Sequence, residues 1–277
     1  MRQELLDLFT VSAGEYLDRW FESTPIKAVL GFDGIVGNYA SPYTPGSAYV
    51  LLHHVFGEVN GVKGAWGHAI GGMGAITQAM AKAALAAGVE LRTDAAVKEV
   101  LVEKGRAIGV LTESGETLHA RAVVANVNPK LLYERLMSPN AVPAPTRERM
   151  ANWRCGSGTL RMNVALSRLP DFTALPGEGD HLTAGIIMAP DLDYMDRAYL
   201  DARANGWSKE PIVEMLIPST LDDTLAPAGQ HVASLFCQQV QPELSGGRNW
   251  DDHRDEVADL MIATVDNHDD VAVFPEP

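Results

Sequence analysis

Apolar residues recur every three or four positions between residues 74 and 87, which predicts an amphipathic helix. Its apolar face consists almost wholly of small side chains: Ala75, Ile76, Ala79, Met80, Ala83, Ala84 and Ala87. Small side chains allow close approach between backbones, so we expect this face to pack tightly on another element, most simply a sheet. Gly88 follows the last periodic residue and is placed to cap the C-terminus of the helix.

After this helix the periodicity changes from helical to alternating. The run VKEVLVE, which begins at Val97, predicts a strand, and GRAIGVLTE predicts its hairpin partner across a turn at residues 104–105. A second turn at residues 114–115 leads into ETLHARAVVANV, where we expect VVAN (123–126) to form a closing strand. A glycine cluster, a helix and several strands are therefore expected within residues 66–126.

The rest of the chain adds further helices and strands. Helical spacing predicts helices over residues 2–21, with a break at 12–15, and in KLLYERLM, YMDRAYLDARANG and WDDHRDEVADLMIATVDN. Four strands are predicted at TLRMNVALSRL, GIIMAP, PIVEMLIPST and HVASLFCQQV, and NAVPAPT reads as a loop. AYVLLHHVF fits a short buried helix or a strand, and the final VAVFPEP has no obvious packing partner. These patterns predict a mixed α/β fold with an inserted sheet.

Charge and composition narrow the class of protein. The chain has 277 residues, of which 46% are hydrophobic, and a formal net charge of −14. Such an acidic surface is unsuited to nucleic acid and to anionic membranes, so neither is expected as a partner. No stretch has the profile of a signal peptide or a membrane span, which favours a cytoplasmic protein. Cys155 and Cys237 lack metal-ligand spacing, so we expect buried thiols in a reducing compartment.

A glycine cluster precedes the helix of residues 74–87. Gly71, Gly72 and Gly74 would let a ligand approach the backbone closely, and free amides at a helix start favour an anion. A tight turn that needs positive φ explains the cluster equally well. The 277 residues contain neither GxGxxG nor GxxxxGK[ST], so we do not expect them to hold a dinucleotide pyrophosphate in the usual way.

Three histidines near this cluster are candidates for chemistry. His53, His54 and His68 flank the glycines in an apolar neighbourhood, where a neutral imidazole could face a ligand. No metal-ligand spacing occurs among the eight histidines, so no metal site is expected. No GxSxG elbow is present. We expect three acidic pairs to cap helices or face water: residues 191 and 193, 222 and 223, and 251 and 252.

A family resemblance extends through the glycine cluster and the hairpin. The stretch WGHAIGGMGAITQAMAKAALAAGVELRTDAAVKEVLVEKGRAIGVLTESGETLHARAVVANVNP resembles phytoene-desaturase-like flavoproteins, which are amine-oxidase-type FAD-dependent oxidoreductases. YLDRWFESTPIKAVLGFDGIVGNYASPYTPGSAYVLLHHVFGEVNG, RMNVALSRLPDF and PIVEMLIPSTLDDTLAPAGQHVASLFCQQV are similar to the pyridine nucleotide-disulfide oxidoreductase domain-containing protein 2 group of that family. The resemblance extends from about Glu15 to about Asp266.

The resemblance implies a partial FAD-binding domain with an interleaved mixed-sheet substrate domain. It assigns residues 1–65 and 129–241 to the substrate domain, 66–128 to the FAD-binding domain, and 242–277 to a C-terminal helix that returns to the FAD domain. Residues expected to contact FAD are Gly71, Gly72, Gly74, Ala96, Val97, Ala125 and Asn126. His53, His54 and His68 would then face substrate or flavin.

The activity that the resemblance implies is hydride transfer from a small apolar or amine-like substrate to flavin. The family also has an N-terminal strand–GxGxxG–helix unit and a C-terminal segment that closes over the flavin, and neither occurs in these 277 residues. We therefore expect a central fragment that is inactive, colourless when purified, and prone to self-association through the alanine-rich helix face. The alternative is a cofactor-free binding or assembly module derived from the substrate domain.

Overall fold

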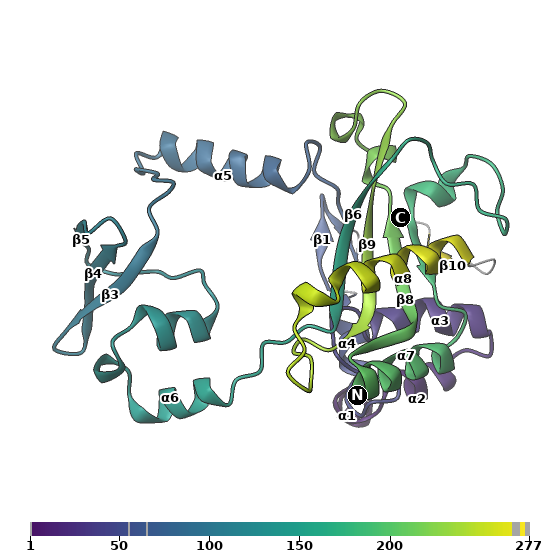
Figure 1. Ribbon diagram of the computed structural model, residues 1–277, viewed down its shortest axis with the longest axis horizontal. Coiled ribbons are helices and arrows are strands. Elements are labelled where there is room, and N and C mark those ends of the chain that lie inside the picture. Colours follow the sequence, from purple (N-terminus) through teal and green to yellow (C-terminus); the bar gives the residue numbers. More distant parts are fainter. Residues whose placement is uncertain (1, 55, 65, 268–271, 275–277) are drawn as a thin grey trace. The chain divides into compact units, whose positions relative to one another are not determined.

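The protein consists of two compact units. A computed structural model describes residues 2–54, 56–64, 66–267 and 272–274 (Figure 1). The larger unit contains residues 1–77 and 156–277, and the smaller unit contains residues 78–155. Helices and sheets are present, as the sequence patterns predict, but the expected mixed sheet is wrong for the described strands, because every pairing between them is antiparallel. The division of the chain into four functional segments stays a prediction.

A five-stranded antiparallel sheet forms the centre of the larger unit, in the order β10-β7-β8-β9-β6. Its strands are β6 (Thr159–Leu166), β7 (Gly185–Met188), β8 (Trp207–Leu216), β9 (His231–Val240) and β10 (Ala272–Phe274). The four predicted strands in this part of the chain are thus confirmed. The expectation that VAVFPEP has no partner is wrong for its described part, because Ala272 pairs with Ile187 at the sheet edge. The other residues of that run lie outside the described residues.

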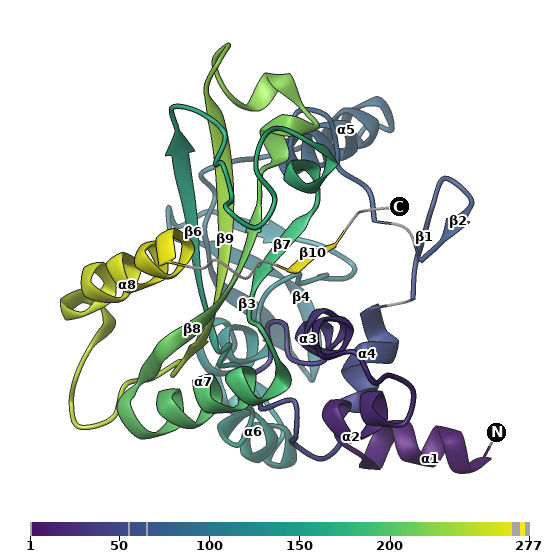
Figure 2. The ribbon, with the colours of Figure 1, turned by 90° about the vertical axis from the view of Figure 1, so that its right-hand side faces the viewer.

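Alternation along β8 and β9 divides the core into two layers. Met215, Leu235 and Cys237 belong to one buried cluster, which also contains Val257 and Met261 of helix α8 (Arg254–Asn267). The second cluster is made of the side chains of the other sheet face, including Ile187 and Ile212, and those of helices α3 (Thr24–Asp33) and α7 (Leu192–Asn205). The sheet therefore lies between α8 and the α3–α7 layer, as Figures 1 and 2 show.

The two cysteines differ in environment. Cys237 is fully buried in the core, and desolvation raises the pKa of its thiol to about 12. Cys155 is exposed, so the expectation that both thiols are buried is wrong for this residue. Its neighbours on either side are exposed as well, because the segment that precedes β6 contributes no side chain to either core cluster, and even Trp153 is 47% exposed.

The N-terminal segment forms short helices, as the predicted break requires. Helix α1 (Arg2–Thr10) ends before Ser12, which opens α2 (Ala13–Asp18) with a capping box. The ambiguous AYVLLHHVF segment is helical over α4 (Ala48–His54). A small hairpin of β1 (Glu58–Val59) and β2 (Val62–Lys63) follows.

Helix α5 (Met73–Ala86) confirms the predicted helix, and Gly88 follows it with a φ of 81°. Its apolar face does not pack as expected, because no residue of α5 is buried. Met73 is 78% exposed and Met80 is 67% exposed. Periodicity identifies an apolar face but does not supply the surface that covers it, and no described residue buries this one.

The smaller unit contains a three-stranded antiparallel sheet of β3 (Val97–Glu103), β4 (Arg106–Thr112) and β5 (Thr117–His119). Lys104 and Gly105 both have positive φ, 48° and 77°, as a tight two-residue hairpin turn requires. The predicted closing strand at 123–126 is wrong, because residues 120–128 contain no strand and Val124 is 94% exposed. A strand needs a neighbour for its amides and carbonyls, and no described segment pairs with this run.

The remaining elements are short. They are the π-helix η1 (Leu131–Leu136), the 3₁₀ turns η2 (Pro139–Ala141), η3 (Asp180–Thr183), η4 (Pro218–Thr220), η5 (Asp223–Leu225) and η6 (Trp250–Asp252), and helix α6 (Ala144–Ala151). The predicted loop at 140–146 therefore includes the start of α6, where proline is tolerated because the first helical amides need no intrahelical partner. Asp191 caps α7, and Gly206 ends it with a φ of 109°, as the pattern predicts.

Candidate functional site

The glycine cluster forms a tight turn directly before α5, within the larger unit. Gly71 and Gly72 have φ values of 87° and 73°, which favour glycine because a Cβ would be strained there. The Gly72 amide donates to the Ala69 carbonyl at 2.8 Å. Gly74 differs, since it lies inside the first turn of α5 and a Cβ added to it would meet nothing within 4 Å. The cluster therefore combines two turn positions with one open position on the helix.

A buried carboxylate holds this turn. The side chain of Asp222, at the start of η5, is fully buried, and its Oδ2 accepts the Gly71 amide at 2.6 Å. Its Oδ1 accepts the backbone amide of Thr224 at 3.0 Å and the hydroxyl of the same residue at 2.6 Å. The Gly71 amide is thus committed to a protein side chain and is not free for an anion.

His68 adjoins the same carboxylate. Its Nε2 lies 3.5 Å from Oδ2 of Asp222, and its side chain is 28% exposed. The Thr224 hydroxyl has the largest effect on the pKa of Asp222; with the amides of Gly71 and Thr224 and with His68, it lowers that pKa to about 2 against the opposing effect of burial. Asp222 is therefore an anion at neutral pH, and an aspartate, an imidazole and a glycine turn meet at this point.

His53 and His54 lie at the C-terminal end of α4 and not on the glycine turn. Their rings meet edge to face, with centroids 5.4 Å apart. Nδ1 of His54 is 2.9 Å from the Val50 carbonyl, so that nitrogen carries the proton and Nε2 is the atom left to accept one. The His54 ring also stacks on Trp66, with a centroid distance of 6.3 Å. Burial raises the pKa of Asp33 on α3, an effect that His54 opposes.

In the smaller unit a pocket of about 360 Å³ adjoins the sheet. It is lined by Glu90, Arg92, Ala95, Val97, Val110, Thr112 and Leu118. The apolar members come mainly from the strands, and the polar members lie in the segment before β3 and at the end of β4. The lining of the pocket thus combines apolar strand residues with three polar residues.

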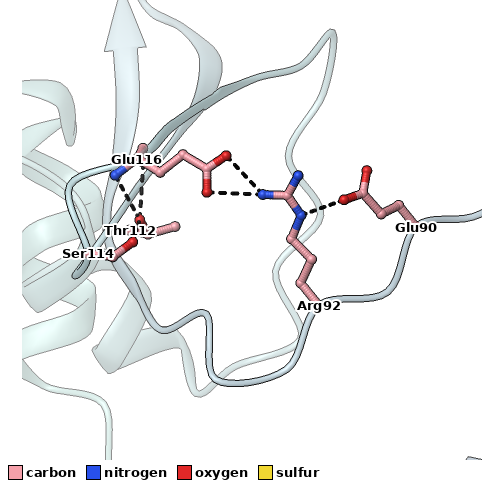
Figure 3. A network of polar contacts seen from close by, with 5 residues as sticks. All are labelled: Glu90, Arg92, Thr112, Ser114 and Glu116. Carbon is pink, nitrogen blue, oxygen red and sulfur yellow. Dashed lines mark hydrogen bonds and ion pairs between the residues drawn. The ribbon is translucent and has the colours of Figure 1, made fainter.

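Figure 3 shows the polar network that includes Glu90, Arg92 and Thr112. Arg92 donates from Nε to Glu90 at 2.7 Å and from Nη1 to both carboxylate oxygens of Glu116, at 2.9 and 3.0 Å. The Glu116 amide donates to the Thr112 hydroxyl at 3.1 Å, and that hydroxyl shares a 2.8 Å hydrogen bond with Ser114. Hydrogen bonds with Glu90 and then Glu116 raise the pKa of Arg92. The ion pairs tie the segment before β3 to the β4–β5 turn.

The predicted cofactor residues are divided between the two units. Gly71, Gly72 and Gly74 lie in the larger unit, whereas Ala96, Val97, Ala125 and Asn126 lie in the smaller unit. In the smaller unit, the Ala96 carbonyl accepts the Glu113 amide at 2.9 Å, and Val97 pairs with Thr112. Ala125 and Asn126, the two predicted contacts within the VVAN run, are exposed and lie in coil. These assignments stay predictions.

Sequence reasoning did not connect Asp222 with the glycine turn. It placed the acidic pair 222–223 at a helix cap or in water, and Asp222 does cap η5. The contact with Gly71 spans 151 positions of sequence, so no local pattern could reveal it. The Arg92–Glu116 pair, 24 positions apart, was missed for the same reason, although the predicted hairpin gave a partial signal.

The described residues also bear on whether the protein has a metal site or a membrane-spanning helix. Among the residues that the structure describes, no three His, Cys, Asp or Glu side chains gather as a metal site. In the same part of the chain, no helix combines the length and apolar character needed to cross a membrane.

The sequence is similar to proteins that are named as oxidoreductases or desaturases. Residues 3–160 match the family described as flavin containing amine oxidoreductase. The chain is 38% identical over 269 residues to pyridine nucleotide-disulfide oxidoreductase domain-containing protein 2 of Rattus norvegicus, covering 93% of this chain and 46% of that protein. It is 34% identical over 134 residues to a zeta-carotene-forming phytoene desaturase of Myxococcus xanthus, covering 48% of this chain and 25% of that protein.

A solved structure supports the fold. The crystal structure of an oxidoreductase from Methanosarcina mazei aligns with a TM-score of 0.61 and 15% sequence identity, over 95% of this chain and 54% of that one. This likeness supports an α/β fold of the type found in FAD enzymes. The chain spans about half the length of the Rattus norvegicus relative and of this structure.

Proposed function

The chain belongs to the family of flavin-containing amine oxidoreductases. From this membership we propose that its residues form part of an FAD-dependent enzyme, which takes a hydride from an apolar or amine-like substrate. The match confirms the resemblance carried by the stretch from the glycine cluster to VVAN, and with it a flavin-dependent oxidoreductase class. The choice of FAD, the substrate and the activity of the whole protein are the proposal.

The observation that carries the proposal is the glycine turn before α5. An added Cβ at Gly74 would meet nothing, and one at Gly72 would meet only Leu225 at 3.4 Å. Open space beside backbone is what a flat cofactor or substrate needs for close approach. We therefore assign Gly72 and Gly74 to the surface that faces the flavin or the substrate. A Cβ at Gly71 would meet Ala75 at 3.2 Å, so Gly71 is included only because the family resemblance implies it.

The pocket of the smaller unit suits the adenine end of the cofactor. Val97, Val110 and Leu118 offer apolar surface to a planar base, and Glu90, Arg92 and Thr112 add polar groups to the lining. Small-molecule sites commonly have this combination of apolar walls and few polar groups. Ala96 and Val97 would contribute backbone groups there, and Ala125 and Asn126 would contact the cofactor from the coil after β5.

The bound flavin would supply the two-electron acceptor, and the protein would position substrate and exclude water. Of the candidate histidines, His54 holds its Nδ1 proton on the Val50 carbonyl, which leaves Nε2 able to accept a proton. His68 is oriented by Asp222. His53 lies beside His54 but is more exposed. We therefore assign proton transfer near the substrate to His68 or His54, and we regard His53 as a weaker candidate.

Two arguments support the substrate class. The name of the Myxococcus xanthus relative specifies phytoene desaturation, which acts on an apolar polyene, and the matched family is named for amines. Both classes can give up a hydride to a flavin. A small apolar or amine-like substrate is therefore the proposal.

Anaerobic flavin reduction tests this proposal. The natural polypeptide that carries these residues would be mixed, without oxygen, with phytoene-like polyenes or with primary and secondary amines. We expect one of these classes to bleach the visible absorbance of the flavin. A flavin that dithionite reduces but that neither class reduces would contradict the substrate assignment. A natural polypeptide without flavin would favour the cofactor-free binding module instead.

A further inference from the structure

We propose that Asp222 is the positioning residue of the glycine turn, and that its buried carboxylate fixes both the Gly71 amide and the His68 imidazole where the turn meets its ligand. The identity of that ligand, flavin or substrate, rests on the proposed function. The positioning itself rests on contacts within the larger unit.

The two oxygens of Asp222 have separate tasks. Oδ1 accepts hydrogen bonds from the amide and the hydroxyl of Thr224, so the side chain is fixed at the start of η5. Oδ2 then points to the turn, where it accepts the Gly71 amide and lies 3.5 Å from Nε2 of His68. The carboxylate therefore connects a fixed corner between β8 and β9 to the segment that starts α5.

The chemistry of this position requires a carboxylate. An ionised carboxylate only accepts hydrogen bonds, and its two oxygens can serve all the donors around Asp222. An asparagine would turn an NH₂ group toward one of these donors and lose at least one bond. Burial of an unpaired charge is costly, and the donors around Asp222 offset that cost only when they are held against the carboxylate, so this buried group fixes the geometry of the donors that it binds.

The charge also bears on which ligand the turn can meet. Because Asp222 already occupies the Gly71 amide with a negative charge, an anionic group at that amide would be repelled. The turn is therefore suited to a neutral ring or to a cationic amine. A phosphate would have to bind elsewhere, which departs from the anion site that the glycine pattern suggested.

The carboxylate also selects a form of His68. A carboxylate near Nε2 favours the tautomer with a proton on that nitrogen, which leaves Nδ1 as a proton acceptor. Asp222 would thus orient the ring and fix its tautomer without touching the ligand. This second effect separates positioning from a merely structural role.

Three variants of the full 277-residue chain, without added flavin, test the proposal. Asp222→Asn removes the charge from the turn. Asp223→Asn is the matched control, because the next residue carries the same charge but is exposed. Thr224→Val removes one donor to Oδ1 and keeps the charge of Asp222.

The readouts are amide hydrogen exchange in residues 66–77 and the His68 tautomer, observed by imidazole nitrogen NMR and assigned with His68→Gln. For Asp222→Asn we expect exchange in residues 66–77 to increase about tenfold, as loss of one hydrogen bond to a charged group implies, and the His68 tautomer preference to weaken. Exchange in β8 and β9 should not change. Asp223→Asn should match the unsubstituted chain in every readout.

Equal behaviour of Asp222→Asn and Asp223→Asn would overturn the proposal. If Asp222→Asn does not fold, Thr224→Val decides, since faster exchange in residues 66–77 supports the proposal and unchanged exchange overturns it. Both readouts are made without flavin. A failure of flavin binding would therefore contradict the proposed function and leave this test intact.

Discussion

The Asp222 carboxylate accepts the Gly71 amide at 2.6 Å across 151 positions of sequence. This bond ties the connection between β8 and β9 to the turn that starts α5. A single buried charge thereby sets the geometry of the glycine cluster that we propose as a ligand contact. The effects of this charge and of the neighbouring glycines can be measured.

Acid should remove the contribution of the Asp222 carboxylate to the stability of the folded chain. Its pKa falls from an ordinary 3.8 to about 2 in the folded chain, chiefly through the Thr224 hydroxyl. A lowered folded-state pKa means that the ionised group stabilises the fold fully above the ordinary pKa and that this stability is lost as pH falls through about 2. The melting temperature of the unsubstituted chain should therefore approach that of Asp222→Asn between pH of about 5 and about 2.

The comparison with Asp222→Asn isolates this effect. Other carboxyls with lowered pKa, Asp7 beside Arg19 and Glu15 in the capping box, titrate in both proteins and cancel in the difference. A difference in melting temperature that stays constant over this pH range would contradict the prediction.

The break between α1 and α2 should depend on the Ser12 cap. The Ser12 hydroxyl accepts the Glu15 amide at 3.2 Å, and the Glu15 carboxylate accepts the Ser12 amide at 3.1 Å. Ser12→Ala is expected to lower the free energy of unfolding by about 1 kcal/mol, measured by urea denaturation. Ser23→Ala is the control, because Ser23 precedes α3 without a side-chain capping bond and should cost less than about 0.5 kcal/mol. Equal losses would show that the cap contributes nothing specific.

Gly74 allows folding and ligand approach to be separated. It has no positive φ and open space beside it, so Gly74→Ala should fold normally and gain up to about 1 kcal/mol from better helix propensity. Flavin binding by the natural polypeptide should nevertheless weaken, because the added methyl group occupies the space assigned to the ligand. Titration with flavin measures this effect, and unchanged affinity would remove Gly74 from the site.

Gly72→Ala serves as the contrasting variant. Gly72 has a φ of 73°, so alanine is strained there whether or not a ligand is bound. We expect this variant to lose stability in a thermal melt as well as flavin affinity. A Gly72→Ala protein as stable as Gly74→Ala would contradict the turn geometry.

The exposed apolar face of α5 should drive self-association of the chain. Met73, Ile76 and Met80 are 78, 44 and 67% exposed and recur at helical spacing. Met80→Lys should raise the concentration at which the chain associates about tenfold, since burying one methionine contributes about 1.5 kcal/mol or more. Analytical ultracentrifugation measures the change, and Gln78→Lys controls for the added charge. Equal effects of the two lysines would indicate that charge, and not the apolar face, governs association.

Local patterns predicted most of the elements but not their long-range contacts. The α5 helix, the hairpin turn at Lys104 and Gly105, and the central strands follow from periodicity and turn chemistry, which are properties of neighbouring residues. The closing strand at 123–126 failed because a strand also needs a partner, which no local pattern supplies. The ambiguous helix or strand at α4 was settled by packing of the N-terminal helices.

The residues of the candidate site were likewise predictable where they form a local pattern, and not where they act through distant partners. Gly71, Gly72 and Gly74 stand out locally because glycines cluster before a helix, and Val97 stands out because a strand begins there. Asp222 and Arg92 act through partners far away in sequence, so only the folded chain reveals them.

The central claim is that these residues serve an FAD enzyme, and the cofactor of the natural polypeptide tests it most directly. That polypeptide, tagged in its own cells and purified, would be denatured to release its cofactor for identification by chromatography and mass spectrometry. The account predicts a stoichiometric amount of FAD that depends on Gly74 and on Asp222. A purified natural polypeptide with no flavin, or with a flavin other than FAD, would contradict it.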